Sequence, residues 1–201
     1  MFLIALTGGS GAGKSTIAQR LGQLGADIVD ADVMARRAVA AGSPALKRIV
    51  ERFGSGVLLE NGELNRAALG SIVFADPQSR IDLEAIVHPA VHALTTAAFA
   101  DITAKKSDAI IVYDVPLLLE ATNRYDFDTV LVAHAPSEIR IERLVEIRGM
   151  TLEEAESRVA AQASDSERIA IADTVIDTSG TLEHTIQQVD DFWNSLHSTD
   201  A

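Results

Sequence analysis

The stretch that decides the fold is Gly8-Gly9-Ser10-Gly11-Ala12-Gly13-Lys14-Ser15-Thr16, which directly follows an apolar run at residues 2–6. Its spacing is G-x-x-x-x-G-K-[ST], the pattern of a phosphate-binding loop between a buried strand and a helix. The glycines allow a tight turn whose backbone N–H groups face a polyphosphate, and the following helix adds positive potential. We expect Lys14 to contact the β- and γ-phosphates and the Ser15 hydroxyl to bind Mg²⁺. A glycine-rich turn without a ligand is the alternative interpretation, but the flanking strand and helix favour a nucleotide site.

The composition excludes several classes of protein. The chain has 201 residues, of which 47% are apolar, and a formal net charge of −12. This favours one folded domain over disorder, and the acidic surface disfavours nucleic-acid partners. The absence of cysteine excludes disulfides and thiolate metal sites. Because no signal peptide or membrane-length apolar run is evident, we expect a cytoplasmic protein without a membrane partner.

The residues on either side of the loop predict a parallel α/β sheet. Residues 2–7 form a short continuous apolar run that is typical of a buried parallel strand. A helix is expected over 14–24, with Gly25 as its C-cap, and a second strand over 26–30. The inward stripe of this helix is expected at Ile17, Ala18, Leu21 and Leu24. The order strand, helix, strand implies a right-handed crossover between parallel strands.

Three further apolar segments, at residues 108–115, 129–133 and 172–177, complete a predicted five-stranded parallel sheet flanked by helices. The last helix follows Thr181. Its inner stripe is expected at Ile186, Val189, Trp193 and Leu196. We expect a single domain over residues 1–201, with its core at 1–32, 108–135 and 166–201. A helical insertion is expected at 33–107 and a helical lid at 136–165.

Two carboxylates follow the second predicted strand. Asp30 and Asp32 lie at the carboxyl end of that strand, where ligands bind in open parallel sheets. One carboxylate there could accept the proton of an attacking hydroxyl, and Asp32 is the candidate base. The alternative is that one of the pair only caps the next helix, since Asp is favoured at that position.

The helical segment contains a break and a pair of histidines. Asp76-Pro77 indicates a break between helices. His88 and His92 are four residues apart, but neither a third ligand nor an H-E-x-x-H pattern supports a metal site. We expect Pro89 to begin a helix with His88 as the boundary residue, and we retain His88 as a candidate substrate contact.

A third carboxylate ends the strand predicted at 108–115. Asp114 occupies a place where phosphate-loop proteins often hold a carboxylate near Mg²⁺, and its alternative role is a polar strand end. Pro116 then ends the strand and sets the direction of the chain.

Arginines are dense in the segment that follows the fourth strand. Pro136 and Ser137 begin a helix with Arg140, Arg143 and Arg148, and Thr151-Leu152-Glu153-Glu154 has the capping-box pattern of another helix carrying Arg158 and Gln162. These cations could close as a lid over phosphates. A salt-bridged surface with Glu138, Glu142 and Glu146 is the alternative interpretation.

The motifs that are absent narrow the class of phosphate-loop protein. A GTPase would need a guanine-reading N-K-x-D segment, and the chain contains no Asn-Lys pair. A small-molecule kinase fits the length, the helical insertion and the arginine-rich lid. A kinase of another nucleotide or metabolite, and an ATP-binding regulatory module without catalysis, are the alternatives.

Over nearly its whole length the chain resembles the dephospho-CoA kinase family. The resemblance rests on motifs in a fixed order: Leu6-Thr7-Gly8-Gly9, Asp30-Ala31-Asp32 with Ala35-Arg36, Gly62-Glu63-Leu64 with Arg66, Ile86-Val87-His88-Pro89, Asp114-Val115-Pro116-Leu117-Leu118 with Glu120, Arg143-Leu144, Arg148-Gly149, Glu154-Ala155, Arg158, Gln162, Ala172-Asp173 and Val175-Ile176-Asp177. The phosphate loop alone would not select this family. Thr178 stands where the family usually has Asn, which affects a turn or an adenine-side contact, and Leu119 stands where it often has Phe.

The resemblance implies that ATP, with Mg²⁺, phosphorylates the ribose 3′-hydroxyl of dephospho-CoA in the last step of coenzyme A synthesis. It implies Asp32 as the base and assigns Lys14 and the backbone of residues 11–16 to the phosphates. Arg140, with Arg143 or Arg148, would close over the γ-phosphate. The acceptor would lie on residues 33–107, and its candidate contacts are Asp32, Arg36, His88, Asp114, Pro116 and Leu117. We expect a monomer or a weak homo-oligomer.

Overall fold

The computed structural model describes residues 1–116, 118–119 and 125–198. The chain divides into two compact units, which are described separately below. The first unit comprises Met1–Val29 and Ile102–Ala201, and the second comprises Asp30–Asp101.

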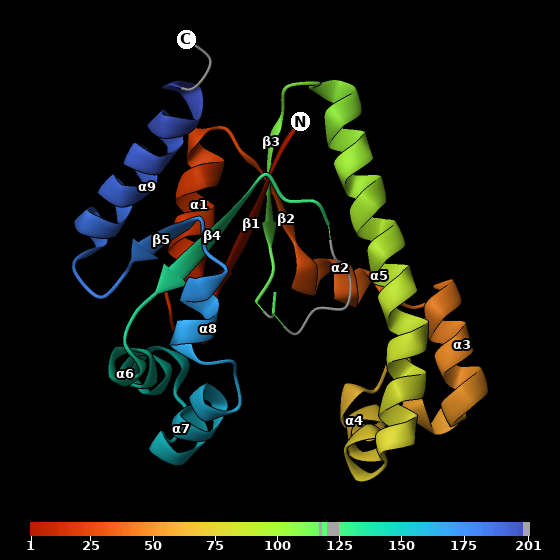
Figure 1. Ribbon diagram of the computed structural model, residues 1–201. Helices are drawn as coiled ribbons and strands as arrows, with labels where there is room; N and C mark the ends of the chain where they lie inside the picture. The colour runs from red at the N-terminus through yellow and green to blue at the C-terminus, as the bar shows by residue number, and fades with distance from the viewer. Residues whose placement is uncertain (117, 120–124, 199–201) are drawn as a thin grey trace. The chain divides into compact units, whose positions relative to one another are not determined.

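A five-stranded sheet forms the centre of the first unit (Figure 1), as the sequence predicts. Its strands are β1 (Phe2–Gly8), β2 (Asp27–Asp30), β3 (Ile110–Asp114), β4 (Thr129–His134) and β5 (Thr174–Asp177). The strand order is β2-β3-β1-β4-β5, and β1 pairs in parallel with both β3 and β4. The central position of β1 explains why its residues 3–8 are all buried.

Two helices, α1 (Lys14–Leu24) and α9 (Leu182–Ser198), pack side by side against the sheet (Figure 1). The predicted bounds of α1 and its Gly25 C-cap, with φ 113°, are confirmed. The core between sheet and helices includes Ile17, Leu21 and Val189. Phe192 is also buried in this core, although the predicted stripe omitted it, whereas Ile186 is only half-buried.

Three short helices, α6 (Ser137–Arg148), α7 (Leu152–Ala160) and α8 (Asp165–Ala170), connect β4 to β5. The capping box of α7 is confirmed, because the Thr151 hydroxyl accepts from Glu154 N and the Glu154 carboxylate accepts from Thr151 N. A second capping box, from Ser164 to Glu167, starts α8 and was not predicted.

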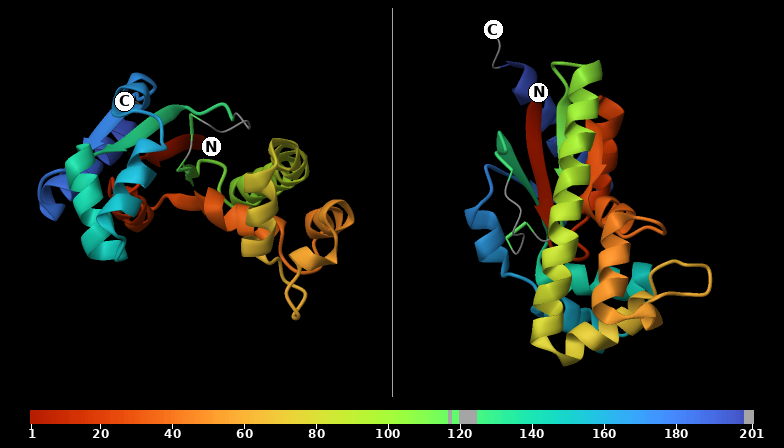
Figure 2. Two further views of the ribbon diagram at one scale, coloured as in Figure 1. Left: turned by 90° about the horizontal axis from the view of Figure 1, so that it is seen from below. Right: turned by 90° about the vertical axis from the view of Figure 1, so that its right-hand side faces the viewer.

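The second unit is mostly helical, as predicted. It contains α2 (Ala31–Ala38), α3 (Pro44–Phe53), a 3₁₀ turn at Ser55–Val57, α4 (Arg66–Ala75) and most of α5 (Pro77–Lys105). Helices α3 and α4 lie beside the first half of α5 (Figure 2). Their apolar faces meet in a core of Val39, Ala45, Ile49, Val57, Leu69 and Ile86.

The expectation that a helix begins at Pro89 is wrong. Pro89 lies inside α5, which begins at Pro77 instead. Asp76 fixes that start, because its carboxylate accepts hydrogen bonds from the backbone N–H groups of Gln78 and Ser79. An interior proline removes one helical hydrogen bond, and burial of Ile86 and Phe99 on either side of it offsets that loss.

By length and mean hydropathy, α5 is the one helix of the described ranges that could cross a membrane. Core helices of globular proteins meet the same criterion, so a single such helix is weak evidence of a membrane span.

Candidate active site

The phosphate-binding loop connects β1 to α1 in the first unit. Gly11 and Gly13 have left-handed backbone conformations, with φ of 80° and 74°, which only glycine adopts at little cost. A hydrogen bond from Ala12 N to Gly9 O, 3.0 Å long, closes the turn. Lys14 is the first residue of α1, so the loop and the positive end of the helix share one site.

Lys14 and Asp114 form an ion pair beside this loop. Asp114 ends β3 and is paired in register with Leu6 of β1, which brings its carboxylate to the same sheet edge as the loop. The carboxylate is therefore placed to orient the Lys14 ammonium. Next to this pair, the Thr7 hydroxyl donates a 3.4 Å hydrogen bond to the Pro116 carbonyl oxygen. Leu117, the other candidate of this segment, lies outside the described residues.

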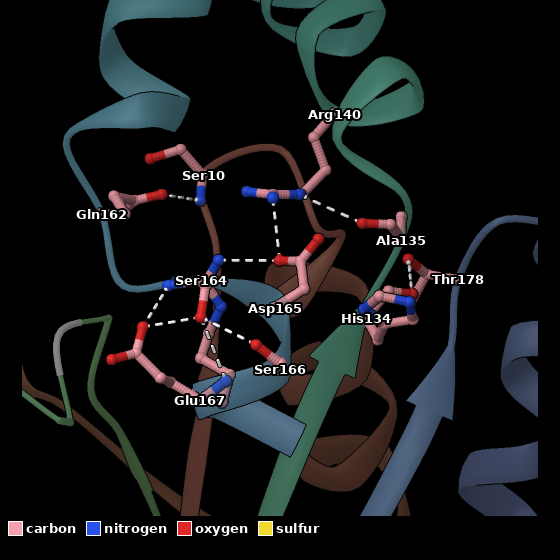
Figure 3. Close-up of polar contacts among 11 residues, drawn as sticks. Ser10, His134, Ala135, Arg140, Gln162, Ser164, Asp165, Ser166, Glu167 and Thr178 are labelled. Atoms are coloured by element: carbon pink, nitrogen blue, oxygen red, sulfur yellow. Dashed lines mark hydrogen bonds and ion pairs between the residues drawn. The ribbon is translucent and has the colours of Figure 1, made fainter. Parts of the chain in front are cut away.

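Arg140 is buried against the loop, with 3% of its surface exposed. Its Nε donates to the Ala135 carbonyl oxygen at 3.1 Å and its Nη2 to Asp165 Oδ1 at 2.8 Å (Figure 3). Its Nη1 is buried without a hydrogen-bond partner in the described part of the chain. That atom lies so close to Gly9 that any Cβ at position 9 would clash with it. Arg140 therefore presents an unsatisfied cationic donor beside the loop, as a phosphate-binding arginine requires.

A second buried arginine, Arg168 of α8, was not predicted. It is 7% exposed, and its Nη2 donates to the same oxygen, Asp165 Oδ1, at 2.8 Å. The hydrogen bond from Arg168 and the charges of both arginines outweigh the effect of partial burial and hold the pKa of Asp165 below its ordinary value. The only sequence signal was the capping pattern at Ser164 and Glu167, which places Arg168 on a short helix but not beside the loop.

Gln162 joins the lid segment to the loop. Its side-chain oxygen accepts a 2.8 Å hydrogen bond from Ser10 N (Figure 3). The sequence placed Gln162 on the helix that follows Thr151. The structure places it beyond the end of α7 at Ala160, and this turn lets its side chain reach the loop.

Thr178, which follows β5, holds the loop from the other side. Its hydroxyl lies 2.9 Å from the Ala12 carbonyl oxygen and 3.0 Å from that of His134. Arg143 donates to the Thr178 carbonyl oxygen at 2.5 Å and to the Gly11 carbonyl oxygen at 3.4 Å. The expectation that this position affects only a turn or an adenine-side contact is therefore too narrow, because Thr178 anchors the loop itself.

The remaining arginines of the lid segment are on the surface. Arg148 is exposed in the last turn of α6, and Arg158 is exposed on α7. For Arg148 and Arg158, this exposure agrees with the alternative interpretation of these arginines as surface charges.

In the second unit, Asp30 caps α2. Its carboxylate accepts hydrogen bonds from Asp32 N and Val33 N at 2.7 and 3.0 Å. The capping role thus belongs to Asp30, and the carboxylate of Asp32 stays exposed in the first turn of α2. Arg36 is one turn further along and lies on the same side of the helix, and His88 is half-buried on α5.

No group of three or more His, Asp or Glu side chains within the described ranges could hold a metal ion. Ser15, which is exposed in the first turn of α1, and Asp114 are oxygen donors at the loop. Such hard oxygen donors suit Mg²⁺ bound together with nucleotide phosphates, which needs few protein ligands.

Comparisons with known proteins identify the family of this chain. Residues 2–184 match the family model for dephospho-CoA kinase. The chain is 54% identical to the dephospho-CoA kinase of Leifsonia xyli subsp. xyli, over 98% of this chain and 99% of that one. A crystal structure of a Thermus thermophilus protein superposes with a TM-score of 0.80 at 30% identity, over 97% of both chains.

The fold is also that of the dephospho-CoA kinase from Campylobacter jejuni, with a TM-score of 0.74 at 24% identity, over 99% of this chain and 98% of that one. The loop, the lysine and the buried arginines thus lie on a kinase fold, and the family match spans most of the chain. The chain belongs to the dephospho-CoA kinase family and is a phosphotransferase that uses ATP to phosphorylate dephospho-CoA.

Proposed function

We propose that this kinase transfers the γ-phosphoryl group of ATP to the ribose 3′-hydroxyl of dephospho-CoA, giving coenzyme A and ADP. The observation that carries the proposed mechanism is the buried, unpartnered Nη1 of Arg140 beside Gly9. A buried cationic donor without a partner is costly, and a phosphate oxygen at the loop would satisfy it.

The loop holds the nucleotide in this mechanism. The loop backbone at residues 11–16 binds the phosphates, and Lys14, oriented by Asp114, adds a positive charge at the β- and γ-phosphates. The Ser15 hydroxyl would hold Mg²⁺, which neutralises charge on the phosphates when bound.

The arginines of α6 have different proposed roles. Arg140 stabilises the charge that develops on the transferred phosphoryl group. Arg143 acts on the nucleotide side through the loop, since its donors contact Gly11 and Thr178. Arg148 is a further candidate for nucleotide contact, and its side chain is exposed to solvent.

Asp32 is the proposed general base. Because Asp30 takes the capping role, the Asp32 carboxylate remains available to accept the proton of the 3′-hydroxyl. Arg36 and His88 are proposed contacts of the acceptor, together with Asp114, Pro116 and Leu117.

The second unit has a cavity suited to an apolar part of the acceptor. Its volume is about 240 Å³, and its lining includes Ala35, Val39, Leu69, Val87 and a single arginine, Arg66. We propose that the part of dephospho-CoA beyond its pyrophosphate group binds in this cavity. For the whole enzyme we propose a cytoplasmic location, a monomer or weak homo-oligomer, and no nucleic-acid or membrane partner; the net charge of −12 supports the absence of nucleic acid.

The test is ADP release from purified enzyme with Mg-ATP, in the presence and absence of dephospho-CoA. AMP, adenosine and shikimate serve as alternative acceptors in parallel reactions. We expect turnover with dephospho-CoA only and a product phosphorylated at the 3′ position, identified by NMR. Preferential turnover of another acceptor would overturn the acceptor assignment, and ATP binding without any turnover would overturn the catalytic one.

A further inference from the structure

We propose that Arg168 is a second phosphate-binding arginine of this enzyme and that Asp165 positions it together with Arg140. This inference rests on the proposed nucleotide site at the loop but not on the identity of the acceptor.

Asp165 balances only one of two buried positive charges beside the loop. Arg140 and Arg168 are both more than nine-tenths buried, and both donate to the single oxygen Oδ1 of Asp165 at 2.8 Å. The pair of guanidinium groups therefore carries two positive charges against one negative charge. A net positive charge held away from water is unfavourable unless an anion compensates it.

The guanidinium groups of both arginines lie close to Gly9 of the phosphate-binding loop. A Cβ atom at Gly9 would clash with Nη1 of Arg140, lie 3.0 Å from its Cζ and lie 3.2 Å from Nη2 of Arg168. The two guanidinium groups thus converge on one residue of the phosphate-binding loop. The Nη1 of Arg140 has no partner among the described residues, so at least one donor of the pair is available to an anion there.

The start of α8 holds Asp165 in place between the two arginines. Asp165 is the first residue of α8, and the capping box between Ser164 and Glu167 fixes the start of that helix. Just before α8, Gln162 accepts a hydrogen bond from Ser10 N of the loop. The segment from 162 to 168 is therefore joined to the loop by the Gln162–Ser10 hydrogen bond and to Arg140 of α6 by the Asp165 carboxylate.

Arg168 attracts a bound anion and Asp165 repels it, so substitutions that remove these two charges should change the affinity for an anion in opposite directions. We would measure the binding of tripolyphosphate, a probe with no nucleoside, by titration calorimetry. Arg168→Gln removes one positive charge but keeps a donor for Asp165, so we expect binding about 10-fold weaker. Asp165→Asn keeps Oδ1 as an acceptor for both arginines but removes its negative charge, so we expect binding about 3-fold tighter. We also expect a lower kcat, because a neutral acceptor holds the Arg140 guanidinium less firmly than a carboxylate does.

The matched control is Arg158→Gln, the same change at an exposed arginine of α7, which should bind tripolyphosphate like the wild type. A purely structural role for the cluster predicts weaker binding in both Arg168→Gln and Asp165→Asn, and that result would overturn the proposal. Unchanged binding in folded Arg168→Gln would also overturn it. If Arg168→Gln does not fold, Arg168→Lys keeps the charge and loses the second donor, and we expect about 3-fold weaker binding.

The binding of tripolyphosphate and the turnover of dephospho-CoA can fail independently of each other. Tripolyphosphate binding requires no acceptor, so failure of dephospho-CoA turnover leaves this test intact. Conversely, wild-type turnover with normal probe binding in Arg168→Gln would remove Arg168 from the site and leave the kinase assignment standing.

Discussion

At the scale of single residues, neighbouring groups of similar chemistry have different tasks. Asp30 and Asp32 are two positions apart, yet only Asp30 caps α2. The Thr178 hydroxyl contacts the loop carbonyl of Ala12, whereas the Thr7 hydroxyl contacts the Pro116 carbonyl. The roles of these residues depend on which backbone groups each side chain can reach.

Asp32→Asn should retain ATP binding and lose most of the phosphoryl transfer. An amide cannot accept the proton of the acceptor hydroxyl, and loss of a general base typically costs about 10²–10⁴-fold in kcat. The measurement is kcat with dephospho-CoA, beside ATP affinity by calorimetry. Asp30→Asn is the matched control, since Asn also caps helices and should leave kcat nearly unchanged. Full activity of Asp32→Asn would exclude Asp32 as the base.

Thr178→Val should loosen the phosphate-binding loop. The change leaves the Ala12 carbonyl oxygen without the Thr178 hydroxyl in a buried place, at a cost of about 1–3 kcal/mol in the free energy of unfolding. We expect a raised KM for ATP and a lower unfolding midpoint in urea. Thr178→Ser keeps the hydroxyl and should stay close to the wild type. Equal KM values in the Val and Ser variants would contradict the anchoring role.

The pH dependence of stability should reflect Asp165. Because its folded-state pKa lies below that of the unfolded chain, the ion pairs of Asp165 stabilise the fold at neutral pH. This contribution is lost as the pH falls through the folded-state pKa, below about pH 4. The unfolding free energies of wild type and Asp165→Asn should therefore converge on acidification from pH 7 to 3. A constant gap over that range would show that Asp165 does not contribute through its charge.

At the scale of elements, most helix ends follow from local rules. Gly25 ends α1, the capping box of Thr151 and Glu154 starts α7, and Asp76 with Pro77 starts α5. Helix α5 does not follow the local rule that a proline begins or ends a helix, because it continues through Pro89. The conformational preference of proline predicts a helix boundary at Pro89. The helix continues instead, with Ile86 and Phe99 buried on either side of the proline.

Pro89→Ala should stabilise α5 by about 1–3 kcal/mol, because it restores the missing helical hydrogen bond and removes the ring from the helix interior. The measurement is the unfolding midpoint of the whole protein in urea. His88→Ala is the companion variant, and it should raise the KM for dephospho-CoA with little change in stability. A lower midpoint for Pro89→Ala would show that the ring itself packs favourably.

At the scale of the whole molecule, ligand binding should be visible as added stability. A ligand at 100 times its Kd that binds only the folded state adds about 2.7 kcal/mol. We expect Mg-ATP to raise the melting temperature of the wild type and of Asp32→Asn, but not that of Lys14→Ala. Removal of Mg²⁺ with EDTA should reduce the shift. A full shift in Lys14→Ala would contradict the role of the loop lysine.

The sequence by itself determined the features that depend on neighbouring residues. The loop at 8–16, the bounds of α1 and the capping box at Thr151 are local patterns, so spacing along the chain was enough to predict them. The five strands were also predictable, because continuous apolar runs between helices favour a buried parallel sheet.

Only the tertiary structure decided which side chains meet at the loop. Gln162 contacts Ser10, Thr178 contacts Ala12, and Arg168 approaches Gly9, although each pair is far apart in sequence. Such contacts are set by the order of strands in the sheet and by the packing of α6 and α8, which spacing does not encode. Among many arginines, burial beside the loop distinguishes Arg140 and Arg168, because only packing excludes water from both of them and leaves Nη1 of Arg140 without a partner among the described residues.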